Sequence, residues 1–316
     1  MDRYGGSRAR GLKIGLRERL AREKDTVIKD WGGRLPIALV YPNSYYIGMS
    51  NLGLHALYSL LNIYRDVVCE RVFWERENQE RKNPPLSLES RRPLSDFKAV
   101  AFTVSYEVDY FNVVSILKAS GIPVFSSDRD ESHPLVLAGG PCITANPMPL
   151  AQFIDVFGIG EAEKLLPGLL PTIIDNINEK RENLLKLLAS VPGMYAPQLP
   201  QATPVMRQWT ENLDNFPVSS VILTRDTELG ELYLIEVERG CSRRCRFCLV
   251  STAFRPMRFR SVGILLAQAE EGLRHRKRIG LVGPAVSDYP HLEKLLAGLR
   301  QMGAQFSMSS MRASNL

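Results

Sequence analysis

The stretch LYLIEVERGCSRRCRFC, residues 232–248, decides the interpretation of this chain. It opens with an apolar run typical of a buried β-strand and passes directly into three cysteines, Cys241, Cys245 and Cys248. Three thiolates on one compact loop can each ligate one iron of a cubane, which leaves the fourth iron without a protein ligand. Because an open iron can bind a substrate or cofactor, the stretch predicts chemistry at a [4Fe-4S] cluster rather than electron storage.

Zinc is the main alternative occupant of these cysteines. Closed zinc sites usually take their ligands as two separated pairs, and no Cys or His lies just downstream of Cys248. Cys69 and Cys142 are isolated in apolar surroundings, which is typical of small buried hydrophobic residues. Five cysteines with three clustered indicate metal binding rather than a disulfide framework, and the N-terminus lacks the pattern of a signal peptide. We therefore expect a reducing, cytoplasmic setting.

The residues after the cysteines alternate between helical and strand patterns. Amphipathic helices are expected from residue 261 to about 274 and over 292–299, with strands over 279–282 and 306–311. Connections of this length suit parallel strands, so residues 229–316 are predicted to form the first half of a β/α barrel. Ser309, Ser310 and Arg312 would then lie near the mouth of the barrel.

The N-terminal part of the chain also predicts an α/β fold. Five short apolar runs separated by helical patterns indicate a doubly wound parallel sheet, Rossmann-like or flavodoxin-like, over residues 35–165. The runs cover residues 37–40, 67–72, 99–104, 135–138 and 154–157. Residues 1–34 are expected to form an appendage with a helix over 11–25 that aligns Leu12, Leu16 and Leu20, and residues 166–228 to form linker helices and a hairpin.

Small and polar residues follow the strands of this predicted sheet. Ser105, Gly139, Gly140, Gly160 and Glu161 all come directly after an apolar run. Ligands of open α/β sheets bind at the carboxyl ends of the strands, where glycine lets a large ligand approach the backbone. The alternative is that these glycines only make tight turns.

The spacing Cys-x-x-x-Cys-x-aromatic-Cys resembles the radical S-adenosylmethionine (SAM) superfamily. Segments YPN at 41–43, GMSNLG at 48–53, AGGP at 138–141 and EVERG at 236–240 resemble the subfamily that carries an N-terminal cobalamin-binding-type domain. The resemblance implies that the open iron chelates the methionyl group of S-adenosylmethionine and that reduction yields a 5'-deoxyadenosyl radical. It also implies an electron donor such as flavodoxin or ferredoxin.

The resemblance assigns further residues to the cofactors. Phe247 matches the aromatic position beside the adenine, with a ring in the core as the alternative. Gly283, Pro284 and Ala285 lie where the family has a Gly-Gly-Glu-like turn that binds the methionyl amino group, although only the first glycine is kept. Cobalamin would be held by Ser105, Gly139, Gly140, Gly160 and Glu161.

Two departures from the family pattern stand out. The segment Asp-x-His-x-x-Gly, whose histidine ligates cobalt in many cobalamin proteins, is absent, since His55 falls in a predicted helix and His133 precedes a strand. A radical SAM core normally has six β/α units, whereas this chain ends after the third strand. We therefore expect the chain to be truncated within that core.

Several functions remain open at this stage. A radical SAM enzyme, with cobalamin-dependent methyl transfer as its natural subclass, is the leading hypothesis. The alternatives are a methylthiotransferase, which usually needs a second cluster on three N-terminal cysteines, and a non-catalytic iron–sulfur binding module. The net charge of +6 permits a nucleic-acid partner without indicating one, and no apolar run approaches the ~20 residues of a membrane span.

Overall fold

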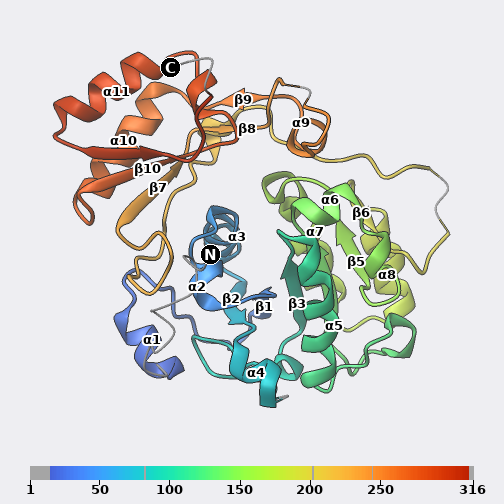
Figure 1. The fold of residues 1–316 in the computed structure, drawn as a ribbon. Helices are drawn as coiled ribbons and strands as arrows, with labels where there is room; N and C mark the ends of the chain where they lie inside the picture. Colours follow the sequence, from blue (N-terminus) through green and yellow to red (C-terminus); the bar gives the residue numbers. More distant parts are fainter. Residues whose placement is uncertain (1–14, 82, 201–202, 244, 313–316) are drawn as a thin grey trace, which may run out of the picture.

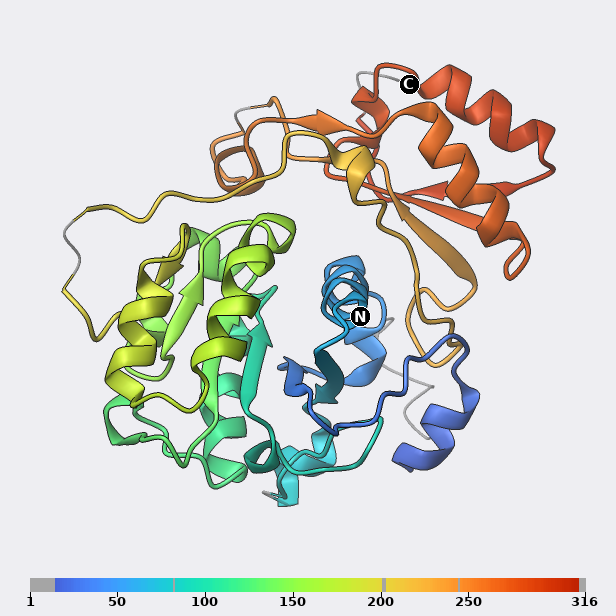
Figure 2. The same cartoon turned by 180° about the vertical axis from the view of Figure 1, so that it is seen from behind.

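The computed structural model describes residues 15–81, 83–200, 203–243 and 245–312 of the chain (Figure 1). An N-terminal part contains a six-stranded sheet, and a smaller C-terminal part contains a three-stranded sheet. Figures 1 and 2 show the C-terminal part lying beyond one end of the larger sheet, with a long irregular segment connecting the two. Among the described residues, no helix is long and apolar enough to cross a membrane.

The larger sheet has the strand order β2-β1-β3-β4-β5-β6, of which the first five strands are parallel. Every residue of β1 and β2 is buried, as expected for strands covered on both faces. The sequence of β1 is a continuous apolar run, whereas β2 also buries Glu70 and Arg71. The order 2-1-3-4-5 is that of flavodoxin-like folds and confirms the predicted fold class. These strands are β1 (Leu35–Tyr41), β2 (Val67–Phe73), β3 (Ala99–Thr103), β4 (Leu135–Gly139) and β5 (Val156–Gly158).

Helices cover both faces of this sheet. One face packs against α3 (Leu52–Ile63), α7 (Ala162–Asn176) and α8 (Arg181–Ala189), whose leucines share a core with β1. The other face packs against α5 (Tyr110–Ala119) and α6 (Pro141–Ala145). The short helices α2 (Tyr45–Gly48) and α4 (Arg76–Arg81) lie in the connections.

Residues 162–195 belong to the larger sheet rather than to a separate linker. All leucines of α7 and α8 except Leu187 are buried in the core of this sheet, and β6 (Met194–Tyr195) pairs antiparallel with β5. The expected hairpin is not formed by the described residues between 196 and 228. Instead, Gln208 forms a bridge with Gly160, and Ser219 with Ile235. These residues therefore connect the two parts of the molecule.

The C-terminal part contains a parallel β/α sheet, as predicted. Its parallel strands β7 (Leu232–Glu236), β10 (Arg278–Val282) and β11 (Gln305–Met308) have the order β11-β10-β7. Helices α10 (Val262–Leu273) and α11 (Leu292–Gln301) pack on one face of this sheet, and Ser261 caps α10 by accepting a hydrogen bond from Ile264 N at 3.4 Å. The opposite face of β7 contacts α3 through Leu234 and Leu52.

The N-terminal segment ties the two parts together. Helix α1 (Leu16–Arg22) places Leu16 and Leu20 against the larger core, while Leu12 of the expected helix lies outside the described residues. After α1, Lys24 forms an antiparallel bridge with Leu223. This segment therefore packs as an appendage on the larger core and contacts the connecting segment at Leu223.

Candidate metal centre and interdomain cavity

The cysteine loop follows β7, and its two ends lie side by side. Two short strands that the sequence pattern did not predict, β8 (Glu238–Arg239) and β9 (Arg258–Phe259), pair antiparallel at its base. Gly240 has φ +86°, and a Cβ there would lie 2.3 Å from the Phe254 carbonyl oxygen. Only glycine therefore suits this position, where the residues after α9 (Val250–Ala253) close against the start of the loop.

The three predicted ligands lie on this loop as free thiols. Cys241 and Cys248 are half-buried and Cys245 is exposed, and Cys248 N donates to the Cys245 carbonyl oxygen at 3.1 Å. Among the described residues, no group of three His, Cys, Asp or Glu could hold a single metal ion. The donor set still fits a cluster chemically, because three accessible thiols on one short loop can each reach a different iron.

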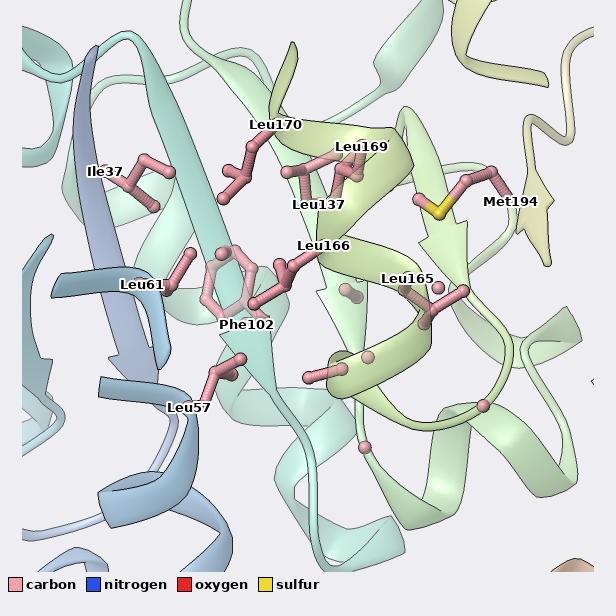
Figure 3. Close-up of a pocket in the computed structure, with 17 residues that line it drawn as sticks. Ile37, Leu57, Leu61, Phe102, Leu137, Leu165, Leu166, Leu169, Leu170 and Met194 are labelled. Atoms are coloured by element: carbon pink, nitrogen blue, oxygen red, sulfur yellow. The ribbon is translucent and has the colours of Figure 1, made fainter. Parts of the chain in front are cut away.

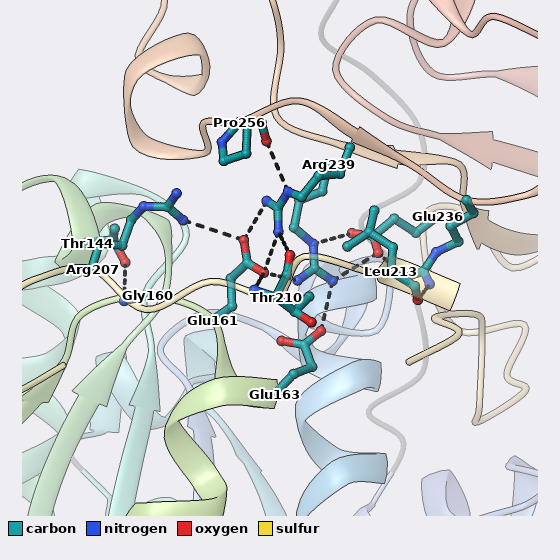
Figure 4. Close-up of polar contacts among 12 residues, drawn as sticks. Thr144, Gly160, Glu161, Glu163, Arg207, Thr210, Leu213, Glu236, Arg239 and Pro256 are labelled. Atoms are coloured by element: carbon teal, nitrogen blue, oxygen red, sulfur yellow. Dashed lines mark hydrogen bonds and ion pairs between the residues drawn. The ribbon is translucent and has the colours of Figure 1, made fainter. Parts of the chain in front are cut away.

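Arg239 connects this loop to the N-terminal sheet (Figure 4). Its guanidinium lies 3.0 Å from Glu161, 2.9 Å from Glu163 and 3.0 Å from Glu236. Arg258, paired with Arg239 across the base of the loop, lies 2.7 Å from Glu161. Glu161 and Glu163 stand at the start of α7, so the edge of the first sheet holds both strands at the base of the cysteine loop.

The electrostatics of this cluster favour ionised carboxylates. Burial by itself would raise the pKa of Glu161, but the hydrogen bond from Arg258 and the charge of Arg239 outweigh it and lower that pKa. Burial likewise opposes ionisation of Glu236, whose pKa is lowered by Arg239 and Arg260. The interdomain contact therefore depends on charged glutamates.

A cavity of about 380 Å³ lies between the two parts. It brings together four residues predicted at the carboxyl edge of the first sheet: Ser105, Gly140, Gly160 and Glu161. The wall contributed by the C-terminal part contains Glu236, Arg239 and Phe254. Gly139 does not line this cavity. It lines a second, apolar cavity among the leucines of α3 and α7 (Figure 3).

Gly140 and Gly160, at this edge of the sheet, are in close contact with the backbone of other segments of the chain. Gly140 has φ +106°, and a Cβ there would lie 2.7 Å from the Val104 carbonyl oxygen. Gly160 has φ +131°, and its Cβ would lie 2.1 Å from the Gln208 carbonyl oxygen. At both positions glycine permits a close approach of two protein segments that are distant in the sequence.

Neither histidine of the N-terminal part, His55 or His133, fits as a protein ligand on cobalt. His55 is buried, contacts the Met49 carbonyl oxygen at 3.0 Å, and has a pKa lowered to about 4 by burial. His133 lies before β4, at the amino end of that strand, and pairs with Asp130. Neither residue lines the interdomain cavity.

The turn after β10 lies against a carboxylate that the sequence did not single out. Ala285 N donates to Glu238 Oε1 at 2.6 Å, and a Cβ on Gly283 would lie 2.6 Å from Glu238 Cγ. The hydroxyls of Ser309 and Ser310 donate to the Gly283 carbonyl oxygen at 2.9 and 2.8 Å. The predicted turn and the serines at the end of β11 therefore come together at the carboxyl ends of the barrel strands.

Phe247 is 93% exposed, so it is not a ring in the core. Its side chain extends from the cysteine loop beside Cys248, where it is available to a ligand of that loop. The stretch from Cys245 to Cys248 thus presents both thiols and an aromatic face.

The comparisons with known proteins define the class of both parts. A model described as "Radical SAM proteins, N-terminal" matches residues 53–197, and one described as "Radical SAM superfamily" matches residues 235–311. The chain therefore contains the N-terminal and core domains of radical SAM proteins. This family implies a [4Fe-4S] cluster and S-adenosylmethionine as cofactors.

An individual relative comes from the archaeon Methanocaldococcus jannaschii. The protein, "Uncharacterized protein MJ0966", is 32% identical over 284 residues, which cover 89% of this chain and 56% of the relative. The chain thus spans about half the length of this curated relative.

Proposed function

We propose that this chain binds a [4Fe-4S] cluster through Cys241, Cys245 and Cys248 and takes part in the reductive cleavage of S-adenosylmethionine. The observation that carries the proposal is the set of three accessible thiols on a loop that leaves the first strand of a radical SAM core. When bound, the cluster would supply the electron that breaks a carbon–sulfur bond of S-adenosylmethionine.

The protein's own residues would bind and orient the ligand. The exposed ring of Phe247 offers an apolar face for the adenine. The turn formed by Gly283, Pro284 and Ala285 stands at the carboxyl end of β10, where barrel enzymes place their binding groups. Arg246 is exposed on the cysteine loop and would favour an acidic surface on an electron donor such as flavodoxin or ferredoxin.

Anaerobic reconstitution with iron and sulfide tests the proposal. We expect about four irons per chain, as counted by metal analysis, and a reduced-state electron spin resonance signal that shifts when S-adenosylmethionine is added. Zinc without iron would overturn the cluster assignment. A cluster whose signal does not respond to S-adenosylmethionine would favour the non-catalytic iron–sulfur module.

Two narrower functions receive less support from the described geometry. Cobalamin-dependent methyl transfer would need a corrinoid site, yet no histidine lines the interdomain cavity, and chain backbone approaches Gly140 and Gly160. Equilibrium dialysis with hydroxocobalamin tests it directly. Methylthiotransfer would need a second cluster, but Cys69 and Cys142 are buried in separate cores of the first sheet.

A further inference from the structure

Glu238 is a buried carboxylate with an unused oxygen. The residue is 1% exposed, its Oε1 accepts the Ala285 N–H at 2.6 Å, and its Oε2 has no hydrogen-bond partner. Within the described part of the chain, no Arg or Lys forms an ion pair with it, whereas Glu236 is paired with both Arg239 and Arg260. Glu236 is therefore neutralised by two arginines, whereas Glu238, two residues later, has no cationic partner among the described residues.

A carboxylate in this state calls for a polar partner. Burying an ionised carboxylate without a cation or a full set of hydrogen bonds is costly. Burial, together with the negative charge of Asp288, raises the pKa of Glu238 to about 7, although the Ala285 N–H opposes the shift. A buried carboxylate with a perturbed pKa is therefore a candidate for contact with a ligand.

The position of Glu238 relates it to two predicted binding elements. It lies three residues before Cys241, and its Cγ occupies the space that a side chain on Gly283 would need. Tyr233, Ile235 and Val237 are buried in the core that α10 and α11 cover. Because side chains alternate along an extended segment, Glu238 projects away from that core, between the cysteine loop and the turn after β10.

The turn after β10 has no carboxylate of its own that could accept a hydrogen bond from a ligand. Gly283, Pro284 and Ala285 carry no charged side chain, and Pro284 has no N–H. The N–H of Ala285 is already donated to Glu238 Oε1. A ligand with N–H donors would therefore find its acceptor at Glu238 Oε2.

We propose that Glu238 Oε2 accepts a hydrogen bond from the methionyl amino group of S-adenosylmethionine bound at this turn. The inference rests on the function proposed above. Of the two cationic groups of the methionyl part, the amino group is favoured over the sulfonium because only the amino group carries N–H donors for an unused acceptor.

Glu238→Gln tests the inference with little change in shape. The glutamine oxygen can keep the bond from Ala285 N, which leaves its NH₂ group, a donor, facing the ligand's amino group. We expect reconstituted Glu238→Gln to bind S-adenosylmethionine roughly tenfold more weakly than the wild type in equilibrium dialysis, because its buried NH₂ group would be left without an acceptor. The analogue that lacks only the amino group should bind equally to both proteins.

Matched controls separate this inference from the proposed function. Glu293→Gln, on the exposed surface of α11, should leave binding unchanged. If the wild type binds neither compound, the proposed function fails. If the wild type binds S-adenosylmethionine and Glu238→Gln binds it equally well, only the inference about Glu238 is overturned.

The binding comparison can still be made if Glu238→Gln fails to hold the iron–sulfur cluster. The two proteins are then compared without the cluster, where iron cannot contribute to recognition of the amino group. The wild type should still prefer S-adenosylmethionine over the analogue, and the variant should lose that preference. Equal preference in both proteins would overturn the proposal.

Discussion

Arg239, two residues before Cys241, lies 3.0 Å from Glu161, the residue that precedes the first turn of α7. The pair joins the base of the cysteine loop to the carboxyl edge of the other domain. Arg258 contacts the same carboxylate from the opposite strand of the base at 2.7 Å. The position of the predicted iron ligands therefore depends on the N-terminal domain as well as on the barrel.

Removing the carboxylate of Glu161 should destabilise the protein. Glu161→Gln leaves Arg258 buried without its carboxylate partner, and breaking a buried pair from one side typically costs 3–5 kcal/mol. We expect a loss of about 3 kcal/mol in urea unfolding, with Glu211→Gln as an exposed control close to zero. A loss below about 0.5 kcal/mol would mean that water replaces the pair in solution.

The same contacts predict a dependence on acid pH. The pKa values of Glu161 and Glu236 are lowered in the folded protein, so their contribution to stability is complete above the unfolded-state pKa of about 4.3 and is lost as pH falls through the folded-state values. The free energy of unfolding should fall from pH 5 toward pH 3. This fall should be smaller in Glu161→Gln, and an equal fall in both proteins would contradict the assignment to Glu161.

The cluster assignment predicts a specific pattern of cysteine variants. Cys241→Ala, Cys245→Ala and Cys248→Ala should each lose the iron–sulfur absorption of the reconstituted protein, because each would remove one of three ligands. Cys69→Ala should retain it, since Cys69 is 1% exposed within the core of the N-terminal sheet. Normal iron and sulfide content in any of the three loop variants would count against the site.

The sequence predicted the parallel strands of both sheets because strands buried on both faces are mostly apolar, whereas the short antiparallel strand β6 was not predicted. It did not place α7 and α8, since their leucine pattern shows that one face is buried without showing which surface covers it. Strands β8 and β9 contain two residues each, too few for a periodic pattern. Gly240 directly follows β8, and its close contact with the Phe254 carbonyl oxygen is evident only in the folded chain.

The candidate site shows the same division between local and tertiary information. The spacing of the cysteines is local, and it identified the loop. Glu161 was predicted as a ligand residue from its place after a strand, yet its arginine partner Arg258 is 97 residues away in the sequence. Glu238 was missed for a similar reason, because its unused oxygen becomes evident only when the turn at Ala285 closes on it. A carboxylate shortly before the first cysteine was the available signal.

Gly240→Ala should disrupt the base of the cysteine loop. The position combines φ +86° with a Cβ that would lie 2.3 Å from the Phe254 carbonyl oxygen, so the backbone on one side must move. Strain of this kind typically costs 1–3 kcal/mol, and the shift would displace Cys241, the next residue. We expect a fall in the midpoint of thermal unfolding and a lower iron content after reconstitution. Gly263→Ala, in α10 with nothing within 4 Å of its Cβ position, is the matched control and should be neutral or slightly stabilising. Equal behaviour of the two variants would show that the loop adjusts at Gly240 without cost.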